Sequence, residues 1–448
     1  MRPRRSMVGP VILIGLGALF LINNLDPDFK IFPLFSTYWP FVLIGWGVLR
    51  LIEVLALAAR GRALPQRGFS GGEVLVVILI AVIGSTSFTV REKLPQMNFG
   101  RWRVSAFGEQ FDYPLTHQAA IPASATLVID NLRGNIRITG SETTDLSLTG
   151  RTTIKAYDRK DADQANEKIP LEFRVEGDRV IIRTNQERAG ENRNVSSDLE
   201  ITVPKGISVE ARGRYGDYDI SDLQGTINII SDNAGVRLNR NAGPAKVELN
   251  RSDVVQVADL KGNLELKARS GDDLNLENIE GEVLVEGGYS GALSFRNIAK
   301  PFRFQSRNTQ LRTEAMPTGS ITMDLGDLRA ERVTGMKLNA QSKDVSIESF
   351  TGPLEIEVRR GDIEVETPET LSAPIQVRAN SGDVRMTIPS TAKFELNGKV
   401  DRGDVDNEYG DPLTKREEDR GATITGKVGS GPVIEVATQR GTLSVRKK

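Results

Sequence analysis

The chain has 448 residues with 58 basic and 59 acidic side chains, so its formal net charge of −1 does not indicate a nucleic-acid partner. It contains no cysteine, which excludes disulfides and thiolate metal sites. Its one histidine, His117, excludes most zinc chemistry and any site that needs two histidines. A chain of this length is too long for one ordinary domain.

Three apolar runs precede residue 91. They cover about residues 8–25, 38–59 and 74–90, and each is long enough to cross a bilayer as a helix. Arginines before the first run and between the second and third runs place those segments in the cytoplasm. Three crossings then leave the rest of the chain outside. Two alternatives stay open: the first run is a cleaved signal peptide, or the third lies on the membrane surface.

The first two runs share a pattern of small residues. ILIGLGALFLI and VLIGWGVLRLI both place Gly-x-Gly inside a frame of leucine and isoleucine, which predicts helix-packing contacts at Gly15, Gly17, Gly45 and Gly47. The ordinary frequency of glycine in membrane helices explains the pattern equally well.

A longer stretch, GPVILIGLGALFLINNL followed by YWPFVLIGWGVLRLI, resembles the LiaI/LiaF-like transmembrane region of bacterial envelope-stress proteins. The resemblance covers about Val8 to Ile52 and includes the Asn23-Asn24-Leu25 exit and the Trp39-Pro40 entry. It implies a regulatory role in which the helices bind a membrane sensor such as a histidine kinase.

Residues 91–124 form a connector or cap. Aromatic residues are rare in free linkers, so Phe111 and Tyr113 predict short extended pieces that pack. We interpret His117 as a surface residue without a role. Residues 125–213 then read as an irregular first portion, with a short helix in RKDADQANEKI and a hairpin around Gly177.

Residues 214–446 carry a repeat. Short triplets of alternating apolar residues, each typical of a half-buried strand, recur with a mean spacing of about 9.4 residues between residues 223 and 304. The triplets begin at Ile227, Val236, Val247, Val255, Leu264, Leu274, Val283, Leu293 and Phe302.

A second signal has twice that period. An apolar residue stands two positions before a glycine or its equivalent, with a first gap of 37 residues and later gaps of 17 to 19. A repeat of about 18–19 residues with two unlike halves cannot bury its own apolar face, so neighbouring coils must stack. The pattern therefore predicts an all-β, parallel β-solenoid, with right-handed winding. The residues are Leu223, Leu260, Ile279, Ile298, Met316, Val333 and Phe350.

The segments VIDNLRGNIRITG, LEITVPKG and the recurrent SGD resemble the bacterial putative-adhesin domain, a β-solenoid family of unknown function. The resemblance covers about residues 125–446. It implies the fold and an adhesin-like binding role, and it brings no catalytic residues.

Gly-Asp pairs are the candidate chemical motif. Carboxylates stacked along one edge of a solenoid suit calcium or glycan binding, or acid/base chemistry on a polysaccharide. Turn chemistry explains them more simply, because glycine supplies positive φ and aspartate bonds nearby backbone. The chain also lacks the dense glycine of calcium-binding nonapeptides. The pairs contain Asp217, Asp272, Asp327, Asp362, Asp383 and Asp404, of which Asp217, Asp272, Asp362 and Asp383 are the weak candidates for cation or glycan binding.

Basic residues also recur at outward strand positions and are balanced by glutamates. This favours a solvated face over a surface for an anionic polymer. The basic residues are Arg237, Lys246, Lys267, Arg296, Arg303 and Arg312, and the glutamates are Glu248, Glu265, Glu286, Glu355 and Glu357.

These patterns predict a bacterial cytoplasmic-membrane protein with a cytoplasmic N-terminus and an extracytoplasmic β-solenoid, periplasmic or at the cell surface. We expect a non-catalytic binding or scaffold protein without cofactor or metal. Its partners would be the bilayer and an envelope polysaccharide or another membrane protein, and nothing indicates its oligomeric state. The alternatives are an envelope-stress regulator and a polysaccharide lyase or hydrolase that uses Asp272 and Asp383.

Overall fold

The computed structural model describes residue 48 and residues 109–190, 195–306, 311–323 and 326–448. The chain divides into two units, residues 1–106 and 107–448, and the second contains nearly all of the described part. The three expected membrane helices, with Gly15, Gly17, Gly45 and Gly47, lie outside the described residues. Among the residues that are described, no helix has the length and apolar character of a membrane span.

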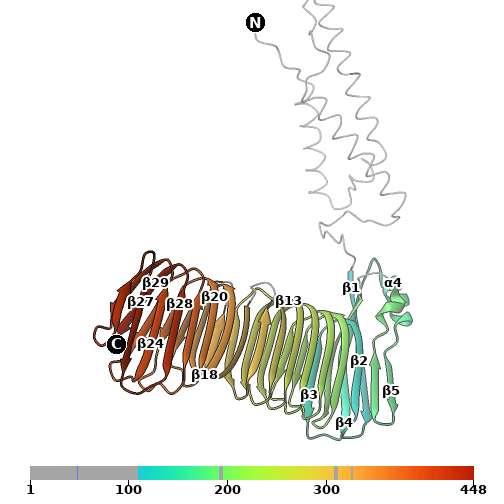
Figure 1. Ribbon diagram of the computed structural model, residues 1–448. Helices are drawn as coiled ribbons and strands as arrows, with labels where there is room; N and C mark the ends of the chain where they lie inside the picture. Colours follow the sequence, from blue (N-terminus) through green and yellow to red (C-terminus); the bar gives the residue numbers. More distant parts are fainter. Residues whose placement is uncertain (1–47, 49–108, 191–194, 307–310, 324–325) are drawn as a thin grey trace, which may run out of the picture. The chain divides into compact units, whose positions relative to one another are not determined.

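The second unit is all-β apart from short helices, and its centre is a stack of coils (Figure 1). Strands of successive coils pair in parallel. Ile227 pairs with Ala245, Ala245 with Leu264 and Leu264 with Val283, so register partners lie 18 or 19 residues apart. The strands of this part are β10 (Ile227–Asn233), β11 (Val236–Asn239), β12 (Ala245–Leu260), β13 (Leu264–Ile279), β14 (Val283–Tyr289), β15 (Leu293–Ile298) and β16 (Phe302–Ser306).

The coils have two faces. The first face contains β10, β14, β16 and the first halves of β12 and β13, and the second face contains β11, β15 and the second halves of β12 and β13. Side chains alternate along each strand, so Ile227 and Ile229 from the first face and Val236 and Leu238 from the second are buried between them. Burial of one such side chain contributes about 1.5–3 kcal/mol, which is why the apolar triplets mark the strands.

An aromatic cluster fills the core near the middle of the stack. The ring centroid of Phe295 lies 5.0 Å from that of Phe302 and 5.5 Å from that of Phe304, and Tyr289 lies 5.9 Å from Phe304. The Tyr289 ring needs glycine beside it, because a Cβ atom at Gly271 would lie 2.7 Å from its Cε1 atom. Burial raises the pKa of the Tyr289 hydroxyl.

One strand interrupts the parallel stack. β17 (Leu311–Met323) runs antiparallel to β15 and β16 on one side and to β18 (Asp327–Ser342) on the other. The winding reverses for one coil and is restored by β18, which pairs in parallel with the strands after it. Met316 lies where β17 passes from the first face to the second, because the register with β18 shifts on either side of Pro317 and pairs Pro317 with Val333. Apolar alternation reads the same in both chain directions, so the spacing could not reveal the reversal.

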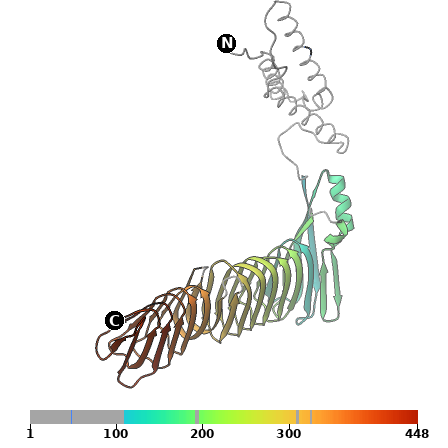
Figure 2. The same cartoon turned by 45° about the horizontal axis from the view of Figure 1, so that its top comes forward.

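The first portion of the unit closes one end of the stack (Figure 2). β2 and β3 pair in parallel with β8 and β9, while the hairpin β5–β6 and the pair β1–β4 extend the two faces outward. Its elements are β1 (Glu109–Ala120), β2 (Thr126–Arg133), β3 (Ile136–Ser141), β4 (Asp145–Ala156), α4 (Arg159–Lys168), β5 (Glu172–Glu176), β6 (Arg179–Arg183), η1 (Gln186–Ala189), β7 (Val195–Pro204), β8 (Ser208–Tyr215) and β9 (Tyr218–Ser221).

The structure contains the short helix and the hairpin that were predicted for this portion. The expected helix is α4, and its first turn is capped by the Asp158 carboxylate, which accepts the backbone N–H of Asp161 at 2.8 Å. The hairpin turns at Gly177, and the expected connector contains β1. His117 on β1 is half-buried and stacks on Phe173, with ring centroids 3.9 Å apart.

The C-terminal strands do not form the end of the stack. β28 and β29 pair in parallel with β22 and β23 on one side and with β24 and β25 on the other. The chain thus passes over one position in the stack and returns to fill it last. The strands are β19 (Asp344–Glu348), β20 (Leu354–Arg360), β21 (Ile363–Glu366), β22 (Ile375–Ala379), β23 (Val384–Ile388), β24 (Phe394–Val400), β25 (Gly403–Glu408), β26 (Thr414–Glu417), β27 (Ala422–Val428), β28 (Val433–Thr438) and β29 (Gly441–Lys447).

Candidate functional site

Glycines form the corner at which the chain passes from the second face to the first. We call it the glycine corner, and it contains Gly225, Gly243, Gly262 and Gly281 in successive coils. A Cβ atom on any of them would overlap backbone atoms of the preceding coil. These positions must therefore lack a side chain for the coils to stack, which explains the glycine in the second sequence repeat.

Left-handed residues precede the glycine corner. The residues at this position have φ values between 50° and 62° although none of them is glycine. Three pairs of them on successive coils are hydrogen-bonded. The Arg240 guanidinium donates to both carboxylate oxygens of Asp222 at 2.8 and 2.7 Å and lowers the pKa of that carboxyl. Farther along, Asn278 Nδ2 donates to Asp259 Oδ1 at 2.8 Å and Asn297 Nδ2 donates to Asn278 Oδ1 at 3.0 Å. Sequence reasoning missed this ladder, although asparagine and aspartate favour positive φ.

The opposite corner holds the Gly-Asp pairs. We call it the aspartate corner, where the chain passes from the first face to the second. Asp217 Oδ1 accepts the N–H of Gly235 at 2.9 Å, Asp362 Oδ1 accepts that of Asp383 at 2.8 Å, and Asp383 Oδ1 accepts that of Thr442 at 2.8 Å. Each of these carboxylates joins its own coil to a neighbouring coil, which is a structural use of the side chain.

Asp272 differs from the other three candidates. Its Oδ1 accepts a side-chain hydroxyl of the next coil, that of Ser290, at 2.9 Å. The adjacent Asp273 accepts a backbone N–H of that coil, that of Ala292, at 2.9 Å. Asp272 is the aspartate of the Gly-Asp pair, but at this coil it is Asp273 that accepts the backbone N–H.

The acidic side chains of this corner do not converge. Within the described ranges, no group of three or more acidic or histidine side chains is arranged to hold a metal ion. Asp272 lies on a coil before β17 and Asp383 several coils after it, so the two carboxylates cannot flank one glycosidic bond.

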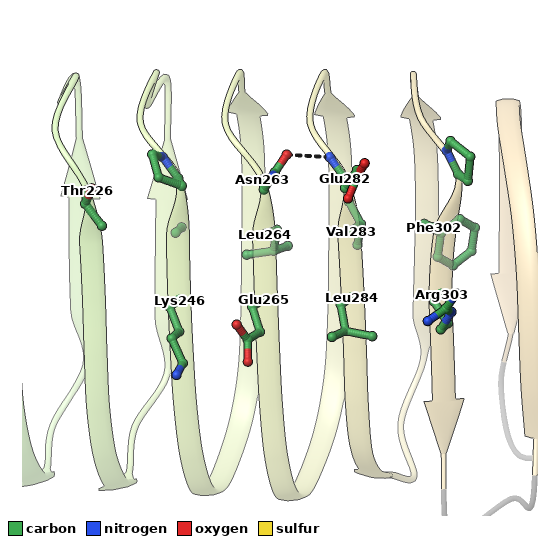
Figure 3. A pocket seen from close by; sticks show the side chains of 13 residues that line it. Thr226, Lys246, Asn263, Leu264, Glu265, Glu282, Val283, Leu284, Phe302 and Arg303 are labelled. Atoms are coloured by element: carbon green, nitrogen blue, oxygen red, sulfur yellow. Dashed lines mark hydrogen bonds between the residues drawn. The ribbon is translucent and has the colours of Figure 1, made fainter.

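A shallow groove of about 550 Å³ lies on the first face beside the glycine corner. Figure 3 shows its side chains in rows across successive strands, with Lys246, Glu265, Leu284 and Arg303 forming one row. Near the corner, Asn263 Oδ1 accepts the backbone N–H of Glu282 at 2.9 Å.

A second groove of about 640 Å³ adjoins the first. It runs across β18, β20, β22 and β28 at the same strand position, and Pro301 lines both grooves. We call the two together the corner trough. Prolines recur along it because a strand start tolerates proline. The trough crosses coils on both sides of β17, and it is lined by Pro244, Pro301, Pro353 and Pro374 together with the residues of the row in Figure 3.

Charges along the trough are paired. Lys246 lies 3.0 Å from Glu248, Lys267 lies 2.7 Å from Glu265, and Lys337 lies 2.9 Å from Glu355 on the next coil. The Lys267 ammonium lowers the pKa of Glu265 through its hydrogen bond. Such exposed pairs stabilise by only about 0.2–1 kcal/mol, but they cancel the local charge. This pairing favours a solvated, near-neutral face over a surface for a polyanion.

Two known protein families match this chain, one in its N-terminal part and one in its C-terminal part. A family model described as Toastrack DUF4097 matches residues 125–446, and one described as LiaF transmembrane domain matches residues 8–94. The second match indicates membrane anchoring at the N-terminus. No curated protein matches the chain.

Solved structures with a similar trace are distant. A "putative cell adhesion protein" from Clostridium sporogenes is 12% identical, with 75% of this chain and 100% of that chain covered and a TM-score of 0.20. A "putative adhesin" from Bacteroides fragilis is 13% identical, with 75% and 97% covered and a TM-score of 0.24. A "putative lipid binding protein" from Parabacteroides distasonis is 13% identical, with 74% and 96% covered and a TM-score of 0.21. Nothing about function follows from likenesses this weak.

Proposed function

Since the chain belongs to the Toastrack DUF4097 family and joins that domain to a LiaF-like transmembrane region, we propose that it is a membrane-anchored, non-catalytic binding scaffold of the bacterial envelope. Three helices, at about residues 8–25, 38–59 and 74–90, would place the N-terminus in the cytoplasm and the solenoid outside. The solenoid would wind right-handed, as parallel connections generally do.

The corner trough carries this proposal. It follows one strand position over coils before and after β17, so an elongated ligand lying along the solenoid would meet a repeated surface. Its mixed and paired charges suit a ligand without strong net charge. The acidic side chains at the aspartate corner are used in coil stacking and lie apart, which supports binding over catalysis.

Cysteine labelling in intact cells tests the topology, because the natural chain has no cysteine. One variant carries Ala299→Cys, at an exposed position of the second unit, and the other carries Gln66→Cys, between the second and third apolar runs. A small membrane-impermeant maleimide should label the first and not the second. The reverse pattern would place the solenoid in the cytoplasm and end the envelope proposal.

The match to the LiaF transmembrane domain favours a second function. The helices would bind a membrane sensor such as a histidine kinase, and the solenoid would report the state of the envelope. Gly15, Gly17, Gly45 and Gly47 would form the packing contact, so replacing them by valine should change the output of an envelope-stress reporter. Unchanged output at normal protein levels would contradict this role.

A further inference from the structure

A third groove, of about 570 Å³, lies on the second face, away from the corner trough. It crosses β12, β13 and β15 and ends at Met323 on β17 and Arg329 on β18. Three of its lining residues are Gln256, Asn275 and Ser294. The strand register pairs Gln256 with Asn275 and Asn275 with Ser294, so the three lie side by side on adjacent strands. We call them the uncharged row.

The uncharged row differs from its surroundings. The same strand position holds Asp219 and Arg237 on the coils before it and Arg329 after β17. Arg329 there forms ion pairs with two glutamates. Over these three coils only amide and hydroxyl groups stand at this position, and beyond Arg329 it holds a serine again at Ser346.

Two polar atoms of the row are orphaned. Asn275 Oδ1 and Ser294 Oγ are buried and have no hydrogen-bond partner within the part of the chain that the structure describes. Native proteins leave few such atoms, and each one is destabilising unless another group completes it. The other orphaned side-chain atoms among the described residues belong to Ser231 and Tyr289, which are buried in the core. Asn275 and Ser294 thus differ from these two residues, because they lie on adjacent strands and line one groove.

We propose that the uncharged row binds a glycan chain through the hydroxyl groups of its sugars. Amides and hydroxyls both donate and accept hydrogen bonds, as sugar hydroxyls do, whereas guanidinium groups only donate and carboxylates only accept. Adjacent strands lie about 4.8 Å apart, so a chain running along the solenoid meets one polar side chain per coil. Small side-chain rotations, which occur within nanoseconds, turn the two orphaned atoms toward the ligand.

Two charged residues at the rim of the groove orient the bound glycan. Asp273 holds one carboxylate oxygen on the N–H of Ala292 and keeps the second for a sugar hydroxyl. Arg296, which is exposed, attracts a carboxylate on an acidic sugar. Neutral and acidic glycans share the hydroxyl contacts and differ only in their use of Arg296.

The test uses the full chain in detergent and two immobilised probes, cellohexaose as the neutral glycan and hexagalacturonic acid as the acidic one. The wild type should bind at least one probe. The double variant Asn275→Leu with Ser294→Val should lose binding at least tenfold. Its melting temperature should stay level or rise, because it removes the orphaned atoms. Arg296→Gln should weaken binding of the acidic probe alone.

Ser346→Val is the matched control. Ser346 occupies the same strand position on the coil after Arg329, outside the groove, so its replacement should leave binding unchanged. Wild-type protein that binds neither probe would overturn the proposal, as would a double variant that binds like the wild type. Binding in detergent does not depend on which side of the membrane the solenoid occupies, so this result and the labelling result are separable.

Discussion

The side chain of Asn241 is hydrogen-bonded to the backbone of Leu223, 18 residues earlier and one coil away. Asn241 Oδ1 accepts the N–H of Leu223 at 3.0 Å, and its Nδ2 atom donates to the carbonyl of Ile220 at 3.0 Å. Asn241 is fully buried at the position that Leu223 and Leu260 hold in the coils on either side. The gap of 37 residues in the apolar repeat therefore spans two coils. At the position between them, the hydrogen-bonded amide of Asn241 replaces the apolar residue.

Replacing Asn241 should loosen this corner. Asn241→Ala removes both hydrogen bonds and leaves a buried N–H and a buried C=O unpaired, at a cost of about 1–3 kcal/mol. Hydrogen exchange of the peptide around Leu223 should then be faster by roughly tenfold or more. Asn250→Ala, which removes a hydrogen bond from exposed Asn250 to Asp232, should change exchange little. Equal effects of the two variants would contradict the special role of Asn241.

Two glycines near one corner should respond in opposite ways. A Cβ atom at Gly352 would overlap the carbonyl of Thr334, and backbone cannot move aside, so Gly352→Ala should destabilise by about 3 kcal/mol or more. A Cβ atom at Gly335 would lie 3.1 Å from the carbonyl oxygen of Pro353, a close contact but not an overlap, so Gly335→Ala should cost less, about 1 kcal/mol. Urea midpoints of the two variants measure the difference. Similar midpoints would show that close stacking does not demand the glycine.

The aspartate corner makes a prediction about metal ions. Asp362→Ala removes the acceptor for the N–H of Asp383 and should cost about 1 kcal/mol, whereas Asp362→Asn retains an acceptor oxygen and should cost little. EDTA should leave the melting temperature of the wild type unchanged. A rise in melting temperature with calcium, lost in both variants, would instead assign cation binding to Asp362.

The Asp222–Arg240 pair gives a pH-dependent stability. Arg240 lowers the pKa of Asp222 in the folded protein below 3.8. The pair therefore stabilises the folded state fully at pH values above the pKa of Asp222 in the unfolded chain. This stabilisation is lost as the pH falls through the lower pKa of the folded protein. Asp222→Asn tolerates the same positive φ and should lower stability at pH 7 by about 0.2–1 kcal/mol, since Arg240 is largely exposed. The difference between wild type and variant should vanish at pH values well below 3.8. A constant difference across this range would exclude the ion pair as its source.

Much of this architecture can be predicted from the sequence because each strand and each corner of a solenoid places a requirement on a few neighbouring residues. Each triplet, such as that at Val283, must alternate to put two side chains in the core, and each corner, such as that at Gly262, must admit a neighbouring backbone. Both requirements concern a few consecutive residues in every coil, so they produce a repeat that can be recognised in the sequence. The candidate aspartates are likewise found at turns, although they bond the next coil rather than their own backbone.

The parts that could not be predicted depend on pairing partners distant in sequence. β17 alternates apolar and polar residues near both of its ends, on either side of Pro317 and Gly319, and nothing within it indicates that it pairs antiparallel. The grooves could not be predicted from any short stretch of sequence either, because the uncharged row brings together Gln256, Asn275 and Ser294 from three coils. Only the register, which sets the 19-residue offset, makes neighbours of them.

The late return of β28 and β29 has a consequence for biosynthesis. Proteins are made from the N-terminus, so the strands on both sides of this position exist before the segment that joins them. A chain that stops before residue 432 would display two facing rows of unpaired backbone groups, which are ready templates for aggregation. The emergence of β28 and β29 from the ribosome is therefore the step that pairs these two rows of backbone groups.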